Sequence, residues 1–191
     1  MGQTLKVVGI SGSLRKDSVN KKLLDFVATQ FPNEVEYKYV DYSEVPLFNQ
    51  DTEMPIPIGV KAFKEQVETA DIVIFATPEY NGSIPGVLKN GIDWLTRPTG
   101  HNSLTGKVAG IIGASPGQGG TIKAQLHLRE ILSHVNMDVP GQPRVMCNYI
   151  KDKLTEDGDI QLEGKELENV QKLNKRLIEM AKAFKKDEVT V

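Results

Sequence analysis

The sequence predicts an α/β fold in three layers, with a five-stranded parallel sheet between helices, as a single domain over residues 1–191. Short apolar runs alternate with longer stretches of helical periodicity along the chain. The run Ile72-Val73-Ile74-Phe75 is apolar throughout, as in a central strand buried on both faces. With 39% hydrophobic residues, the chain is long enough to bury one sizeable core.

The strands are predicted from apolar or alternating runs. The second strand alternates apolar and polar residues, and the loop that follows it, over 42–57, contains Pro46, Pro55 and Pro57. The predicted strands are 5–10, 35–41, 71–76, 108–113 and 144–150.

The helices are predicted from amphipathic spacing. Pro85 suits the first turn of the third helix, where its missing N–H costs nothing. The last helix follows a polar segment, 153–164, which turns at Asp157-Gly158. The predicted helices are 21–31, 60–68, 85–96, 122–135 and 165–185.

Composition excludes several classes of function. The net charge of -2 gives no basic surface for nucleic acid. A lone cysteine, Cys147, excludes an internal disulfide and a multi-cysteine metal site. No apolar run is long enough to span a membrane, and the first residues lack a secretory pattern. We therefore expect a cytoplasmic protein that binds no metal.

The segment after the first strand, residues 9–20, is rich in hydroxyl groups and leads into a helix. Helix N-termini present unpaired N–H groups and a positive dipole end, which together bind phosphate. The side chains able to add donors are Ser11, Ser13, Arg15, Ser18 and Asn20. So many donors suit a terminal phosphate monoester better than a shared pyrophosphate.

Two further loops follow strands of the same sheet. Residues 77–86 contain Tyr80, Asn81 and Gly82, which offer an aromatic surface, an amide and exposed backbone to a planar ring. Residues 113–121 are rich in glycine, so a ligand can lie against bare backbone there. Because the carboxyl ends of parallel strands share one edge, the three loops predict a site for a phosphorylated planar cofactor.

Two other enzyme classes fit parts of this pattern. The segment Gly9-Ile10-Ser11-Gly12-Ser13 approaches a hydrolase nucleophile elbow, although serine replaces its final glycine. Asp41 stands where a dinucleotide-binding dehydrogenase carries its ribose-binding acid, but Gly-x-Gly-x-x-Gly is absent. The histidines His101, His127 and His134 show no metal-binding spacing, and Cys147 reads as a buried apolar residue.

The chain resembles the NADPH-dependent FMN reductase family, which includes azoreductase, quinone reductase and chromate reductase types. The resemblance extends from the first strand to the fifth, and its longest motif is 78–94. It rests on segments 12–20, 46–51, 78–94, 113–115, 119–120 and 125–129. It implies a flavodoxin-like sheet of order 2-1-3-4-5, bound FMN, and a homodimer or tetramer.

The resemblance also implies which residues bind FMN, and it places dimer contacts on the third and fourth helices. The phosphate would be held by Ser11, Ser13, Leu14, Arg15, Ser18 and Asn20. The ring and ribityl chain would lie between Pro78, Glu79, Tyr80, Asn81, Gly82, Ser83, Ser115 and Gly117. The implied interface residues are Asn90, Trp94 and Arg129.

The expected chemistry needs no catalytic side chain, because the flavin supplies the reactive atoms. Hydride would pass from NADPH or NADH to FMN, and then to a flavin, quinone, azo compound or similar acceptor at the same face. This order predicts ping-pong kinetics. The backbone N–H groups of Asn81, Gly82 and Ser83 would stabilise the reduced ring. The alternative is an FMN electron carrier or redox sensor that NAD(P)H does not reduce.

Overall fold

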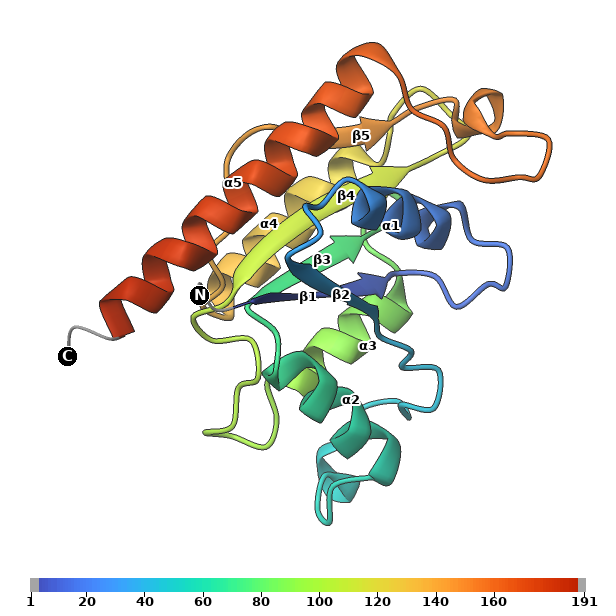
Figure 1. The fold of residues 1–191 in the computed structure, drawn as a ribbon. Helices are drawn as coiled ribbons and strands as arrows, with labels where there is room; N and C mark the ends of the chain where they lie inside the picture. The colour runs from blue at the N-terminus through green and yellow to red at the C-terminus, as the bar shows by residue number, and fades with distance from the viewer. Residues whose placement is uncertain (1–3, 189–191) are drawn as a thin grey trace.

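A computed structural model describes residues 4–188 as one parallel sheet between two layers of helices (Figure 1). The strands are β1 (Leu5–Ser11), β2 (Val35–Tyr39), β3 (Ile72–Ala76), β4 (Val108–Ala114) and β5 (Val145–Cys147). The α-helices are α1 (Val19–Thr29), α2 (Ile58–Glu68), α3 (Gly86–Leu95), α4 (Ile122–His134) and α5 (Gly164–Glu188). Two short 3-10 helices span Gln50–Thr52 and Ile150–Lys153.

The strand order is β2-β1-β3-β4-β5, and all neighbouring strands are parallel. This confirms the predicted α/β fold and its flavodoxin-like order. The order reverses between β1 and β3, so the ligand crevice of such a sheet lies beside the loops after these strands. It also differs from the order 3-2-1-4-5-6 of the dinucleotide-binding alternative.

Alternate residues of the central strand supply two separate cores. Ile72 and Ile74 of β3 pack into the core beneath α1 and α5, whereas Val73 and Phe75 pack into the core beneath α2, α3 and α4. Figure 1 shows α1 and α5 on one side of the sheet and α2 and α3 on the other. The sheet is therefore covered on both faces, and its carboxyl edge carries the connecting loops.

Several predicted boundaries differ from the structure, and two of the differences have a clear local cause. Helix α1 begins at Val19 rather than at residue 21, because the Ser18 side chain accepts a hydrogen bond from Lys21 N–H and caps it. Strand β5 ends at Cys147 rather than at residue 150, since Tyr149 has a left-handed backbone (φ 47°) that no strand accommodates. Within residues 4–188, no helix is long and apolar enough to cross a bilayer.

Candidate active site

The turn after β1 is anchored by its own buried polar groups. Gly12 N–H donates to the Ala76 carbonyl at 2.7 Å, which ties this turn to the end of β3. The Ser11 hydroxyl is fully buried, donates to the Ser13 carbonyl at 3.1 Å and accepts from Ser13 N–H at 3.2 Å. Tyr42 donates to the Ser11 carbonyl at 2.7 Å, and burial raises the pKa of Tyr42, so its hydroxyl keeps this proton.

The same turn also contains donors that have no acceptor among the described residues. The N–H groups of Leu14, Lys16 and Asp17 make no hydrogen bond within residues 4–188. The hydroxyls of Ser13 and Ser18 accept from backbone N–H groups and keep a hydrogen to donate. The exposed Arg15 guanidinium forms no ion pair with any described residue. This donor set, at the N-terminus of α1, fits the phosphate of FMN.

The Asn20 side chain is hydrogen-bonded to protein backbone. Its amide nitrogen donates to the Ala114 carbonyl at 3.0 Å and its amide oxygen accepts from Ala114 N–H at 2.9 Å. The side chain therefore joins the first turn of α1 to the end of β4. Both Asn20 and Ser11 shape the turn from within, so contact with phosphate remains a prediction that rests on Ser13, Arg15 and Ser18.

The loop after β3 contains a tight hairpin, which we call the Tyr80–Ser83 hairpin. Tyr80 and Ser83 exchange two backbone hydrogen bonds, of 3.1 and 3.0 Å. The two residues between them, Asn81 (φ 53°) and Gly82 (φ 76°), take the positive φ angles that such turns require. Within the hairpin, the N–H groups of Tyr80 and Ser83 are used, and those of Asn81 and Gly82 have no protein acceptor among the described residues.

The loop after β4 presents open backbone and then enters α4. A side chain at Gly117 or Gly119 would meet no atom within 4 Å, so this backbone is accessible to a ligand. Ser115 donates its hydroxyl to the Gly117 carbonyl at 3.0 Å, which holds the loop in a turn. Thr121 joins the loop to α4 with a left-handed backbone (φ 66°).

The structure brings all three predicted loops together at the carboxyl edge of β1, β3 and β4. A Cβ added at Gly12 would lie 3.1 Å from Pro78, and one added at Gly113 would lie 2.7 Å from the Thr77 carbonyl. A side chain at Gly113 would overlap the Thr77 carbonyl, and one at Gly12 would be in tight contact with Pro78, so the three loops pack closely here. The arrangement places a donor-rich turn beside two backbone-lined walls, as a phosphorylated planar ligand requires.

One aromatic residue at this edge was missed by the sequence analysis. Tyr149 is 47% exposed, and its N–H donates to the Gly117 carbonyl at 3.3 Å. The sequence prediction placed Tyr149 inside the fifth strand, which hid its position beside the glycine-rich loop. Leu14 and Tyr80 are also exposed, so three loops at this edge each carry a large exposed side chain.

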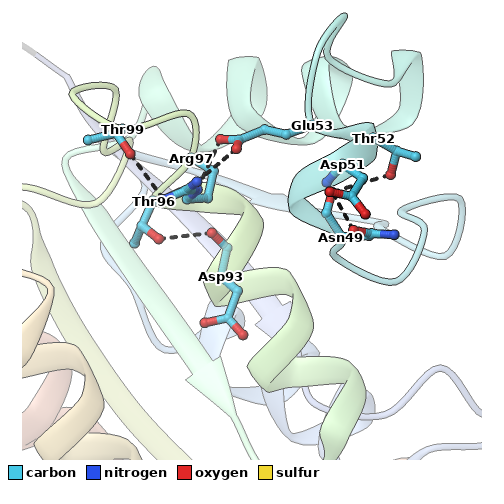
Figure 2. A network of polar contacts seen from close by, with 8 residues as sticks. All are labelled: Asn49, Asp51, Thr52, Glu53, Asp93, Thr96, Arg97 and Thr99. Carbon is cyan, nitrogen blue, oxygen red and sulfur yellow. Dashed lines mark hydrogen bonds and ion pairs between the residues drawn. The ribbon is translucent and has the colours of Figure 1, made fainter.

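The loop after β2 is held against α3 and the residues that follow this helix. Figure 2 shows Glu53 receiving two hydrogen bonds from Arg97, at 2.9 and 2.7 Å, while Arg97 also donates to Thr99. On the same loop, Asn49 accepts from Asp51 N–H and from Thr52. The loop is therefore held by polar contacts along the flank of α3.

Two of the implied interface residues, Asn90 and Trp94, form hydrogen bonds with the loop after β2. Trp94 is 1% exposed and donates to the Pro46 carbonyl at 2.8 Å, so it packs within its own chain, and its contact with a partner stays a prediction. Asn90 bonds the Pro46 carbonyl and Phe48 N–H. Arg129, the third, donates to the carbonyls of Val139 and Pro140.

The two candidate nucleophiles of the sequence, Ser11 and Cys147, are both buried. The Ser11 hydroxyl is buried and hydrogen-bonded to the Ser13 backbone, so it is not exposed as the nucleophile of a hydrolase elbow must be. Cys147 is fully buried, and burial raises the pKa of its thiol to about 12, which makes it the inert residue predicted. Among residues 4–188, no three His, Cys, Asp or Glu side chains lie close enough to hold a metal ion.

A flavodoxin-like sheet with a phosphate-type turn and backbone-lined walls at its switch point defines a flavin-binding class of protein. Residues 5–152 match the NADPH-dependent FMN reductase family, and the chain belongs to that family. Its members are oxidoreductases that use FMN with a reduced nicotinamide donor. The predicted family, enzyme class and cofactors are therefore confirmed.

Individual relatives agree with this assignment. The chain is 40% identical over 172 residues to an NAD(P)H-dependent FMN reductase of Pseudomonas aeruginosa, covering 90% of this chain and 92% of the relative. It is 39% identical over 156 residues to a 2-hydroxy-1,4-benzoquinone reductase of a Burkholderia species, covering 82% and 85%. A solved flavoenzyme, the NAD(P)H:(acceptor) oxidoreductase FerB of Paracoccus denitrificans, superposes with a TM-score of 0.83 at 34% identity, covering 94% and 98%.

Proposed function

We propose that this enzyme passes hydride from NAD(P)H, through FMN held at the carboxyl edge of the sheet, to a quinone or another small acceptor by a ping-pong mechanism. The names of two relatives, one a benzoquinone reductase and one an FMN reductase, support quinones and flavins as acceptors. Azo compounds and chromate are further candidates for the same open site.

This proposal rests on a chemical difference among the three loops: one offers hydrogen-bond donors, and the other two offer accessible backbone. The turn after β1 concentrates unpaired donors at the N-terminus of α1, whereas the loops after β3 and β4 present accessible backbone. Such an arrangement suits a ligand with one dianionic end and one flat, neutral end. FMN has that form, and bound there it supplies the hydride-transfer chemistry.

In this mechanism the residues of the protein bind FMN and orient it, and they orient the substrates beside it. Arg15 and the hydroxyls of Ser13 and Ser18 would hold the phosphate. The unpaired N–H groups of Asn81 and Gly82 would donate to the ring where negative charge develops on reduction. Both NAD(P)H and the acceptor would use the face bordered by Tyr80 and Tyr149, one after the other.

The decisive experiment adds NADPH to the FMN-loaded protein without oxygen. Rapid loss of the oxidised flavin absorbance is expected, and a later addition of benzoquinone should restore it. Steady-state rates with benzoquinone, FMN, an azo dye and chromate would then rank the acceptors, and parallel double-reciprocal lines would indicate ping-pong kinetics. A flavin that stays oxidised would instead support the electron-carrier alternative.

Arg15→Ala tests the phosphate site. Loss of one charge-assisted contact, typically about 1.5–3 kcal/mol, should weaken FMN binding about tenfold or more. Fluorescence titration of the apoprotein measures this change, and Arg176→Ala, on the exposed face of α5, is the matched control. Unchanged affinity in Arg15→Ala would contradict the assigned role.

We also propose a homodimer. Three large apolar side chains, Leu47, Met54 and Ile58, are 84%, 66% and 88% exposed on the β2–α2 connection and the start of α2. Exposed apolar side chains in one segment often mark an interface. Sedimentation equilibrium measures the oligomeric state directly, and a monomer at micromolar concentration would contradict this proposal.

A further inference from the structure

Both ends of the Tyr80–Ser83 hairpin are attached to α4. At the first end, one Glu79 carboxylate oxygen accepts from Lys123 N–H at 2.9 Å and from Ala124 N–H at 3.2 Å. At the second end, the Ser83 hydroxyl lies 2.8 Å from His127 Nδ1. Because residues 123 and 127 are one helical turn apart, these attachments lie on the same side of α4.

The Glu79 contact supplies a cap that α4 lacks. No backbone N–H of the first turn donates to the side chain of Thr121, the residue before α4; its hydroxyl accepts instead from the Gln125 side chain at 3.2 Å. Unbonded N–H groups at a helix start are normally satisfied by a residue just before the helix. Here they are satisfied by a carboxylate from the loop after β3, whose charge also suits the positive end of the helix.

The His127 contact does not depend on the tautomer of the ring. A serine hydroxyl both donates and accepts, so it can pair with Nδ1 in either form. His127 is exposed on α4 and has no role in the flavin chemistry described above. The hairpin also packs on this helix, since a Cβ at Gly82 would lie 3.6 Å from the Lys123 side chain.

Helix α4 therefore connects the two walls of the site. The glycine-rich loop runs directly into α4 at Thr121, and the hairpin is hydrogen-bonded to the first two turns of the same helix. We propose that Glu79 and His127 are positioning residues that fix the hairpin to α4 and so set how closely the N–H groups of Asn81 and Gly82 approach the flavin ring. This inference rests on the proposed function, because it takes FMN to lie between these walls.

His127→Ala tests the second attachment, with His127→Asn and His134→Ala as companions. Loss of one hydrogen bond should weaken FMN binding about five- to tenfold and lower the midpoint potential of the bound flavin. Asparagine can place an amide near the position of Nδ1, so His127→Asn should recover most of both properties. His134, exposed in the last turn of α4, makes no side-chain hydrogen bond with the described residues, so His134→Ala should match the wild type.

Fluorescence titration of FMN and dye-coupled potentiometry are the two readouts, and the melting temperature of each apoprotein monitors the fold. Should His127→Ala fail to fold, Ser83→Ala removes the same bond from the hairpin and carries the same expectation. If the wild type binds FMN and His127→Ala equals His134→Ala in affinity and potential, the inference is overturned. If the wild type itself binds no FMN, the proposed function fails instead.

Glu79 tests the first attachment. Glu79→Gln keeps an oxygen that accepts both N–H groups, whereas Glu79→Ala removes it. FMN affinity should therefore stay close to wild type in Glu79→Gln and fall about tenfold in Glu79→Ala. Equal affinity of Glu79→Ala and wild type would show that the hairpin holds its position without this contact.

Discussion

Single residues at the strand ends decide how closely the site's loops pack. Gly113, near the end of β4, lies against the Thr77 carbonyl, the Thr121 hydroxyl and the Gln125 amide. Gln125 in turn donates to the Val145 carbonyl at 2.9 Å, which ties α4 to β5. A side chain at position 113 would push these elements apart, so this glycine is required for packing.

Gly113→Ala should destabilise the protein by about 1–3 kcal/mol, because its Cβ would overlap Thr121 and approach backbone that cannot move aside. For a chain of this size, the melting temperature should fall by about 3–10 °C. Thermal unfolding followed by circular dichroism measures the change. Gly141→Ala, where the Cβ would meet no atom within 4 Å, should melt like the wild type, and equal melting of both variants would contradict the argument.

Among the secondary-structure elements, α3 organises the long β2–α2 connection. Asn90 and Trp94 bind its first part through the Pro46 carbonyl, and Arg97, just past the helix, binds Glu53. Arg97 also lies 5.4 Å from the Phe48 ring centre, a cation–π distance. Glu53 is only 7% exposed, so its charge needs this partner.

Arg97→Ala should therefore destabilise the fold more than loss of an ordinary surface ion pair. The Arg97 side chain is 26% exposed, so the expected cost is about 1–3 kcal/mol, below that of a fully buried pair. Urea unfolding measures it. Lys61→Ala, which breaks an exposed pair at 3.9 Å, is the control and should cost about 0.5 kcal/mol or less. Equal losses of unfolding free energy in the two variants would show that the Arg97–Glu53 pair contributes no more to stability than an exposed surface pair.

At the scale of the whole molecule, binding at the carboxyl edge should stabilise the fold, since the three loops come from distant parts of the chain. Glu79 and α4 are linked across 44 residues, and Asn20 and Ala114 across 94. A ligand that touches these loops together binds only the folded state, and its binding energy adds to folding stability.

FMN at about one hundred times its dissociation constant should stabilise the protein by about 2.7 kcal/mol and raise the melting temperature by about 5–10 °C. Riboflavin, which lacks the phosphate, should raise it much less at the same concentration. Differential scanning fluorimetry of the apoprotein compares the two ligands. Equal shifts would contradict a phosphate-binding turn after β1.

Much of the fold was predictable because its signals are local. The apolar run of β3, the Asn-Gly turn and the hydroxyl-rich turn each lie within a few neighbouring residues. These signals predicted the alternating elements and the three loops that carry the site. Predicted element boundaries were wrong where a capping side chain or a single backbone angle determines the end of the element, as at Ser18 and Tyr149.

The sequence alone determined the α/β class, the residue types at the strand ends and, through its motifs, the reductase family. Only the tertiary structure showed that Asn20 binds backbone and that Trp94 is buried beneath the β2–α2 connection. Only the tertiary structure showed that the Tyr80–Ser83 hairpin is hydrogen-bonded to α4. The physical reason is that periodicity and turn chemistry depend on neighbouring residues, whereas hydrogen bonds between distant segments form only when packing brings them together.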